Sequence, residues 1–232
     1  MPEEILIQNK APHHPLVSIA LTTSKSEFFI REQIDSLLNQ TYKNLEVVIS
    51  HDEFGDGTVA ILNEYVALDS RVRWSFNPHQ KGFIKNTENA IDMCNGGIIF
   101  LCDHDDSWFP EKVEEHVLAY QDPTVDWVYN RLVITDSENK KEIGYIEDTL
   151  PDYYRDKSMF ENAWGSCIGG AMTSYRANLL HKVMPVGRYA PAHDSWIQLA
   201  IWPAKAVFIN KVLQKYRQHA NNVVGMNVGG KE

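Results

Sequence analysis

The chain has 232 residues, 44% of them hydrophobic and 23% charged, so it is long and apolar enough to bury a sizeable core and is unlike a disordered or fibrous protein. Its formal net charge of -9 at pH 7 argues against a nucleic-acid backbone as the main partner, because phosphate contacts need clustered Lys and Arg. Three cysteines without Cys-x-x-Cys spacing, and no apolar run of about 20 residues, predict a cytoplasmic protein without disulfides, zinc knuckle or transmembrane segment.

Strands and helices alternate along the first half of the sequence. Short apolar runs predict strands at residues 16–21, 45–50, 72–76 and 98–102, and helical spacing predicts helices at 27–39, 58–68 and 83–94. Such alternation indicates a mostly parallel sheet. Ligands of parallel sheets bind beyond the carboxyl ends of the strands, where this sequence places Thr22, Thr23, Asp52 and Asp103. We expect the functional site at that edge.

The pattern is less regular after Pro110. We expect a helix to about residue 120, a strand near 127–134, a turn at 137–141, a helix start at 195–199 and a last strand near 212–217. No internal repeat, low-complexity tract or linker interrupts the sequence.

An acidic cluster, Asp103-His104-Asp105-Asp106, follows directly on the apolar run at 98–102. Its carboxylates repel one another unless a cation is bound, and their oxygens suit Mg²⁺ or Mn²⁺, which bridge phosphate oxygens. A negatively charged protein can bind a nucleotide in this way. The alternative is a solvated turn in which Asp106 or Ser107 caps the next helix.

Several other residues have both a chemical and a structural interpretation. Asp52 is a possible partner for a base or ribose, or a turn residue, and Asp194 is a catalytic candidate or a helix cap. His219 is a metal-ligand candidate or an exposed histidine. Gly169 and Gly170 permit close approach of the backbone to a ligand, or mark a bulge in a strand.

Taken in chain order, these features resemble family 2 glycosyltransferases of the GT-A fold from Val17 to Val224. The matching segments are residues 17–23 with Glu27, 33–42, 48–52 with Asp56 and Thr58, 82–86, 103–110, 169–170, 193–194 and 216–219. The sequence departs from the family pattern in three places that touch the nucleotide pocket. His51 replaces the usual first Asp, Glu53-Phe54 replaces Gly-Ser, and Ser24-Lys25 replaces Tyr-Asn.

The resemblance implies an α/β fold of the GT-A (Rossmann-like) type, with a mostly parallel central sheet flanked by helices and a smaller acceptor-side region. It implies one domain over residues 1–232, with about 16–110 binding the nucleotide sugar and about 111–232 supplying the acceptor side and the catalytic base. Three sets of residues follow from the matching positions and the sheet edge: nucleotide-sugar binding by Thr22, Thr23, Glu27, Asp52, Lys85 and Asp103; metal binding by Asp105 and His219; and general-base catalysis by Asp194.

The activity implied is inverting transfer of a hexosyl or deoxyhexosyl group from a UDP- or dTDP-sugar, with Mn²⁺ or Mg²⁺, in bacterial polysaccharide or glycoconjugate synthesis. Similarity to rhamnosyltransferases suggests dTDP-rhamnose as the donor. The acceptor would be a saccharide or a lipid-linked saccharide, met in the cytoplasm or by peripheral contact with the inner face of the membrane. Two alternatives are a non-catalytic nucleotide- or carbohydrate-binding module and a nucleotidyltransferase. The latter predicts a glycine-rich phosphate loop, which residues 22–25 lack.

Overall fold

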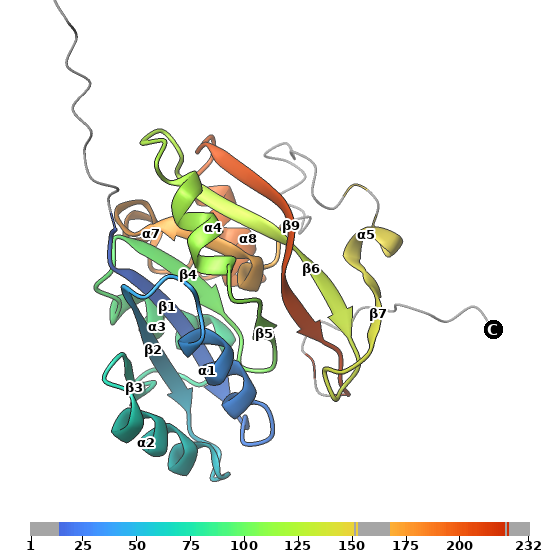
Figure 1. Ribbon diagram of the computed structural model, residues 1–232. Helices are drawn as coiled ribbons and strands as arrows, with labels where there is room; N and C mark the ends of the chain where they lie inside the picture. Colours follow the sequence, from blue (N-terminus) through green and yellow to red (C-terminus); the bar gives the residue numbers. More distant parts are fainter. Residues whose placement is uncertain (1–13, 151, 153–167, 221, 223–232) are drawn as a thin grey trace, which may run out of the picture.

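The computed structural model describes residues 14–150, 152, 168–220 and 222. In its first half, strands and helices alternate (Figure 1). The elements are β1 (Val17–Ser24), α1 (Ile30–Leu38), β2 (Leu45–Asp52), α2 (Thr58–Leu68), β3 (Val72–Phe76), α3 (Phe83–Asp92) and β4 (Ile98–Cys102). The four strands pair in parallel, with Val17 opposite both Leu45 and Ile98. The expected parallel sheet is thus confirmed for this half.

The second half adds shorter and mixed elements to the same sheet. They are β5 (Ser107–Trp108), α4 (Lys112–Ala119), β6 (Trp127–Thr135), β7 (Glu142–Tyr145), α5 (Ile146–Thr149), the 3₁₀ turn η1 (Gly170–Met172), β8 (Thr173–Arg176), α7 (Ala177–Val183), α8 (His193–Ala200) and β9 (Ala206–Arg217). The strand order is β3-β2-β1-β4-β8-β6-β9-β5, and β7 pairs with β6. β8 is antiparallel to β4 and β6, whereas β9 runs parallel to β6 and antiparallel to β5.

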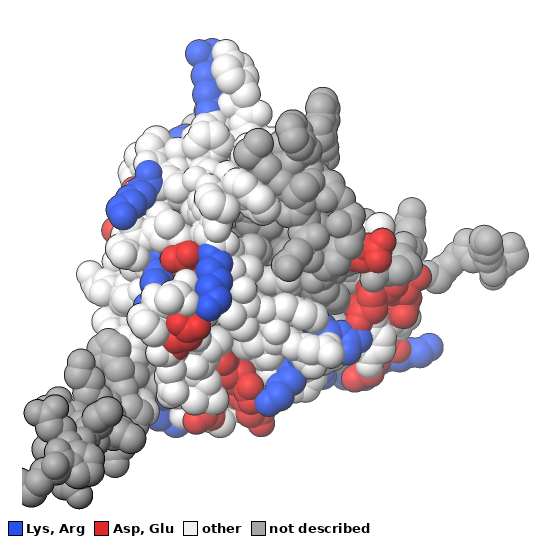
Figure 2. Space-filling model, turned by 90° about the horizontal axis from the view of Figure 1, so that it is seen from above, with Lys and Arg blue, Asp and Glu red and all other residues white. Residues whose placement is uncertain are grey.

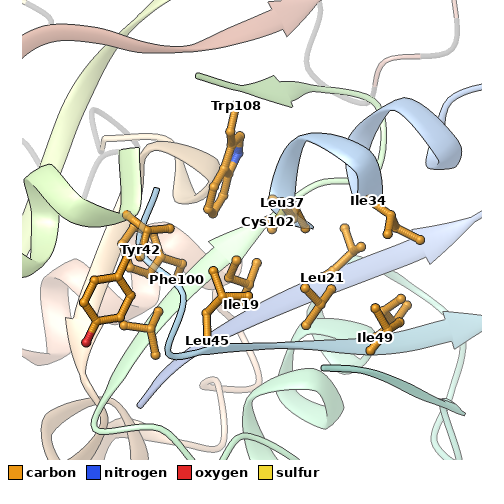
Figure 3. Packing of buried hydrophobic residues seen from close by; sticks show 14 of the residues in the cluster. Ile19, Leu21, Ile34, Leu37, Tyr42, Leu45, Ile49, Phe100, Cys102 and Trp108 are labelled. Atoms are coloured by element: carbon orange, nitrogen blue, oxygen red, sulfur yellow. The ribbon is translucent and has the colours of Figure 1, made fainter. Parts of the chain in front are cut away.

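Successive side chains of each strand point to opposite faces of the sheet, and both faces are apolar. Helices cover each face and bury these side chains. Ile19, Leu21 and Ile49 pack with Ile34 and Leu37 of α1 on one face, where Phe100 and Trp108 also lie (Figure 3). Ala20, Val48, Ile99 and Leu101 face the other side, where they pack with residues of α3, α7 and α8. Two apolar cores therefore fix the strands from both sides, and each strand's register determines which residues reach the sheet edge.

Several element boundaries and three short strands differ from expectation. α1 begins at Ile30 and not near residue 27, because residues 25–29 form a loop in which Ser26 N donates to Thr58 Oγ1 at 3.0 Å. β9 begins at Ala206, earlier than expected. β5, β7 and β8 were not anticipated as strands, since they are only two to four residues long. Within the described residues, no helix is both long and apolar enough to cross a bilayer.

Candidate functional site

The arrowheads of β1, β2 and β4 in Figure 1 point toward the same edge, and the end of β9 reaches it from the second half of the chain. Parallel pairing in register places Ser24 beside Asp52, while Leu21 pairs with Cys102, after which the acidic cluster begins. The sheet itself therefore gathers Thr22, Thr23, Asp52 and Asp103 as expected.

Asp52 holds the loop that enters α3. Its Oδ1 accepts a hydrogen bond from Asn77 Nδ2 at 2.8 Å, and its Oδ2 accepts from the backbone N–H of Gly82 at 2.7 Å. Gly82 has φ 137°, a conformation open to glycine, so its N–H can turn toward the carboxylate. Asp52 thus organises residues 77–82 and does not open the turn at 53–57. A ligand at this edge meets a carboxylate that two donors already orient.

Thr23 and His51 form a buried polar pair between β1 and β2. Thr23 Oγ1 lies 2.9 Å from His51 Nδ1, and the Thr23 carbonyl accepts from Asn86 Nδ2 of α3 at 3.1 Å. Burial lowers the pKa of His51, so the imidazole is neutral. Its Nε2 has no hydrogen-bond partner among the described residues. Thr22 is half-buried, and its backbone hydrogen-bonds His104.

Glu27 closes the loop between β2 and α2. Its Oε2 accepts from Gly57 N–H at 2.8 Å, and a Cβ at Gly57 would lie 2.8 Å from that oxygen. Position 57 therefore requires glycine for this contact. Glu27 belongs to the predicted set, whereas nothing in the sequence analysis singled out Gly57.

Asp103 is the first residue of the acidic cluster and lies exposed, although protein surrounds it at longer range. This partial desolvation, then the negative charges of Asp105 and Asp194, raise its pKa to about 7. Because the Asp103 side chain is exposed to water, desolvation contributes less to the raised pKa than full burial would. The charges of Asp105 and Asp194 are then the cause that describes this site best. They show that negative charge from two distant parts of the chain converges here.

Asp105 and His219 meet directly. Asp105 Oδ2 lies 3.0 Å from His219 Nε2, and their side chains are 14% and 10% exposed. Asn222 Nδ2 donates to the same oxygen at 3.3 Å, and the imidazole stacks on Phe29 with ring centroids 4.5 Å apart. The structure therefore brings together the two residues predicted to bind metal. His219 is not a freely exposed histidine.

The donor types at this position fit a divalent cation. A carboxylate oxygen and an imidazole nitrogen are both ligands for Mn²⁺, whereas Mg²⁺ prefers oxygen throughout. In the described part of the chain, no group of three or more His, Cys, Asp or Glu side chains is arranged to hold a metal. Asp105 and His219 therefore suit a cation whose other ligands come from water and from bound phosphate oxygens.

Asp106 turns away from this position. It is 1% exposed, its Oδ1 accepts from Arg217 N–H at 3.3 Å, and its Oδ2 accepts from Gln214 Nε2 at 3.4 Å. α4 begins at Lys112 without a side-chain cap. The alternative in which Asp106 or Ser107 caps that helix is thus wrong for this protein.

Asp194 lies in the first turn of α8, beyond its cap residue Ala192. Its Oδ2 accepts from Gly170 N–H at 3.3 Å, and its Oδ1 accepts from Ser195 N–H at 2.7 Å. A Cβ at Gly170 would lie 2.9 Å from His193 Nε2, so the glycine lets the η1 turn pack against α8. Gly169 and Gly170 form this turn, and the predicted bulge in a strand is not present there.

Lys85 is paired with an acid of its own helix. Its Nζ donates to Glu88 Oε2 at 2.6 Å, and Glu88 Oε1 accepts from Val186 N–H at 2.8 Å. The Lys85 side chain remains 43% exposed. The sequence analysis did not identify Glu88, because one Glu on an amphipathic helix carries no distinctive pattern.

Two lysines gather around Phe54 near Asp52. The ammonium groups of Lys25 and Lys81 lie 4.9 Å and 4.3 Å from the Phe54 ring centroid. These residues include two of the departures from the family pattern noted above, and cation–π contacts connect them. Elsewhere, the face in Figure 2 shows Lys and Arg side chains in small groups close to Asp and Glu, without a broad basic patch.

Comparisons with known proteins show which sequences and folds this chain resembles. Residues 18–184 match the model of the family described as Glycosyl transferase family 2. The Escherichia coli UDP-Glc:alpha-D-GlcNAc-diphosphoundecaprenol beta-1,3-glucosyltransferase WfgD is 28% identical over 124 residues, which cover 53% of this chain and 48% of that protein.

Solved structures show the same fold at low sequence identity. S. aureus TarS in complex with UDP-GlcNAc matches with a TM-score of 0.70 and 16% identity, over 89% of this chain and 59% of that one. Mannosyltransferase PcManGT from Pyrobaculum calidifontis, in complex with GDP-Man and Mn²⁺, matches with a TM-score of 0.70 and 18% identity, over 92% and 61%. The chain thus spans less than two thirds of the length of each of these three proteins.

Proposed function

Because this chain belongs to glycosyl transferase family 2 and has the GT-A fold, we propose that it transfers a sugar from a nucleoside-diphosphate sugar to an acceptor hydroxyl with inversion at the anomeric carbon. One observation supports this proposal above the others. The Gly170 N–H donates to the Asp194 carboxylate at 3.3 Å, and a Cβ at Gly170 would lie 3.6 Å from Asp194 Cβ and 3.4 Å from Leu101 Cδ1 of β4, two residues before the acidic cluster begins. A donor held by that cluster would lie in front of a potential base.

Asp194 is the proposed general base. An acceptor hydroxyl is a poor nucleophile near neutral pH, so a carboxylate within hydrogen-bond reach must take its proton as the new glycosidic bond forms. The N–H groups of Gly170 and Ser195 each donate to one carboxylate oxygen and so fix its direction. Each oxygen keeps a lone pair that can accept from a hydroxyl.

The proposed donor site lies at the ends of β1, β2 and β4. Asp52 would face the base, with Thr22, Thr23 and Glu27 shaping the nucleoside pocket and Asp103 near the ribose. Asp105 and His219 would hold Mn²⁺ or Mg²⁺, and the imidazole favours Mn²⁺. When bound, such a cation stabilises the charge of the departing diphosphate as a Lewis acid. Lys85 would add positive charge once its bond to Glu88 yields to phosphate.

We further propose a UDP- or dTDP-sugar as donor and a saccharide or lipid-linked saccharide as acceptor. Structural neighbours were solved with UDP-GlcNAc and GDP-Man, and the name of the E. coli relative describes a diphosphoundecaprenol-linked acceptor. Such an acceptor supports a role in polysaccharide synthesis, and we propose that the reaction takes place at the cytoplasmic face of a membrane. A rhamnosyl donor stays a prediction from sequence resemblance.

Replacement of Asp194 by Asn tests the proposed base. Asn keeps the size of the side chain and one acceptor oxygen, but it cannot take a proton. We expect Asp194→Asn to bind donor within a few-fold of the parent and to transfer sugar about 10²- to 10⁴-fold more slowly. The measurement is the transfer rate to an acceptor together with calorimetry of the nucleotide.

Glu114→Gln is the matched control, because Glu114 also lies in the first turn of a helix and its carboxylate bonds Thr41 at 2.7 Å. This variant should transfer at the parental rate. Parental transfer by Asp194→Asn would assign the base to another residue. Nucleotide binding without transfer to any acceptor by the parent would favour the non-catalytic module.

A further inference from the structure

Lys112, the first residue of α4, is fully buried, with 0% of its surface exposed. Its ammonium donates to the carbonyl oxygen of Ala171 at 2.8 Å and to Gln214 Oε1, and it lies 3.8 Å from the centroid of the Trp108 ring. Two carbonyl oxygens and one aromatic face therefore surround the charge. This cluster lies outside the set of residues that carries the proposed reaction.

Burying an ammonium group costs desolvation free energy that an apolar side chain of the same length would avoid. Burial lowers the pKa of Lys112 to about 7, which shows that the charged form is disfavoured there. Methionine has a similar length and would fill the space without desolvating a charge. What Lys112 provides in addition is directed hydrogen bonds to elements that are far apart in the sequence.

The first of those elements is the η1 turn. Met172 N–H donates to the Gly169 carbonyl at 3.1 Å and Thr173 Oγ1 donates to the Gly170 carbonyl at 2.6 Å, so two internal hydrogen bonds hold the three-residue turn together. Lys112 fixes this turn through Ala171. The same turn presents Gly170 N–H to the Asp194 carboxylate. The ammonium is thus connected to the proposed base through one short turn.

The second element is the acidic loop after β4. Gln214 accepts from Lys112 and donates through Nε2 to Asp106 Oδ2 at 3.4 Å. Asp106 immediately follows Asp105, whose carbonyl oxygen accepts from Arg217 Nε at 2.8 Å. Lys112 therefore connects the turn that holds the base with the loop that faces the donor.

We propose that Lys112 is a positioning residue for sugar transfer, which fixes the η1 turn relative to the acidic loop and so holds Asp194 at the distance from the donor that proton abstraction requires. The inference rests on the proposed function of Asp194 as base. It assigns to Lys112 no contact with donor or acceptor.

Lys112→Met tests this role, with Lys211→Met as the matched control. Lys211 also joins α4 to β9, through Glu115 at 2.6 Å, but its side chain is 60% exposed. We expect Lys112→Met to lower kcat for transfer about tenfold or more while the donor KM and the Kd for the nucleoside diphosphate change less than about threefold. Lys211→Met should keep the parental kcat, donor KM and nucleotide Kd. A parental kcat in Lys112→Met would overturn the inference.

A double variant separates positioning of the base from general damage. If Lys112 acts through Asp194, then Lys112→Met should cause no further loss of rate in the Asp194→Asn background. Multiplied losses, or equal losses of kcat and nucleotide affinity, would show a structural role and overturn the inference. Parental transfer by Asp194→Asn alone would instead contradict the proposed base, so the two failures are distinguishable.

Lys112→Gln serves if the methionine variant does not fold, as judged by thermal unfolding. Its amide can still donate to Ala171, so kcat should lie between those of the parent and Asp194→Asn with an unchanged donor KM. The glutamine side chain is shorter than lysine by one bond. If Lys112→Gln kept the parental kcat while its crystal structure showed no contact with Ala171, the positioning role would be contradicted.

Discussion

His116 is a wholly buried histidine of α4 whose two ring nitrogens both have partners. Nδ1 lies 2.8 Å from Ser174 Oγ, and Nε2 lies 3.0 Å from Asn130 Oδ1. Since a carbonyl oxygen only accepts, Nε2 carries the proton and Nδ1 accepts from the serine hydroxyl. Burial and the nearby Lys112 charge keep the pKa of His116 well below its usual value. The imidazole is therefore neutral in the folded protein.

This neutrality predicts how stability changes with pH. The unfolded histidine binds a proton near pH 6.5 and the folded one does not, so its contribution to the free energy of unfolding is present above pH 6.5 and lost as pH falls below it. Between pH 7.5 and 5.5 we expect the contribution of His116 to the free energy of unfolding to fall by on the order of 1 kcal/mol. Urea unfolding at both pH values measures it.

His116→Gln removes the titrating group and keeps a side chain that can bond on both sides. The variant should be less stable than the parent at pH 7.5 but should lose less stability than the parent on acidification. His14→Gln is the control, because His14 is exposed. An equal pH dependence in the parent and His116→Gln would show that His116 takes up a proton in the folded state.

For single residues, those in a recognisable sequence motif were predicted as site residues. Those outside any motif were missed. The family resemblance assigned Asp105 and His219 to one metal position, and the two side chains do lie side by side although they are 114 positions apart; the metal role of both stays a prediction. Lys112 and His116 look like ordinary polar positions on an amphipathic helix. Only the packing of β9 and η1 against α4 shows that they are buried, and a single sequence does not contain that arrangement.

The contact between η1 and α8 depends on Gly170. A Cβ there would lie 2.9 Å from His193 Nε2, 3.4 Å from Leu101 Cδ1 and 3.6 Å from Asp194 Cβ. Gly170→Ala must therefore displace the His193 imidazole, which belongs to the first turn of α8 and lies next to Asp194 in the chain. We expect transfer to slow by about 10- to 100-fold, because small misplacement of a reacting group is costly, while nucleotide affinity stays within about threefold.

Gly97→Ala provides the control for this element, since a Cβ at Gly97 would meet nothing within 4 Å. It should transfer at the parental rate. Steady-state kinetics and calorimetry on the two variants give the comparison. A Gly170→Ala variant that lost nucleotide affinity and transfer equally would show that the turn supports the donor pocket and not the base.

Helices and strands with a clear apolar repeat in the sequence were predictable. Those that form only because neighbouring strands pair with them were not. α2, β3 and β4 have the expected boundaries, because each is a clear apolar pattern ended by turn residues. β8 has the sequence Thr-Ser-Tyr-Arg, which carries little strand signal, and it forms because β4 and β6 pair with it from both sides. Tertiary pairing decides such strands.

Across the whole molecule, the net charge of -9 opposes binding of a diphosphate. We therefore expect nucleotide affinity to depend on a divalent cation held by Asp105 and His219. Calorimetry of UDP and dTDP with Mn²⁺, then with chelator, should show at least about a tenfold difference in Kd for the preferred nucleotide, or about 1.4 kcal/mol.

Asp105→Asn should abolish most of the difference between the nucleotide Kd with Mn²⁺ and the Kd with chelator. Asp122→Asn should leave that difference unchanged. Asp122 also loses one negative charge, but it lies in an exposed ion pair with Lys205 at 2.9 Å. This pair of variants separates a metal ligand from a general effect of net charge. Equal affinities of the parent with and without the cation would remove the metal from the proposed function.

The position of β9 in the sheet has a consequence for the order in which contacts form during synthesis. β9 follows all other described strands along the chain, yet it inserts between β6 and β5. The ribosome has already made the donor side of the sheet when β9 emerges, and the His219 beyond it reaches Asp105 only after that insertion. The contact between Asp105 and His219 therefore forms only after β9 has emerged from the ribosome, later than the pairing of β1, β2, β3 and β4 can begin.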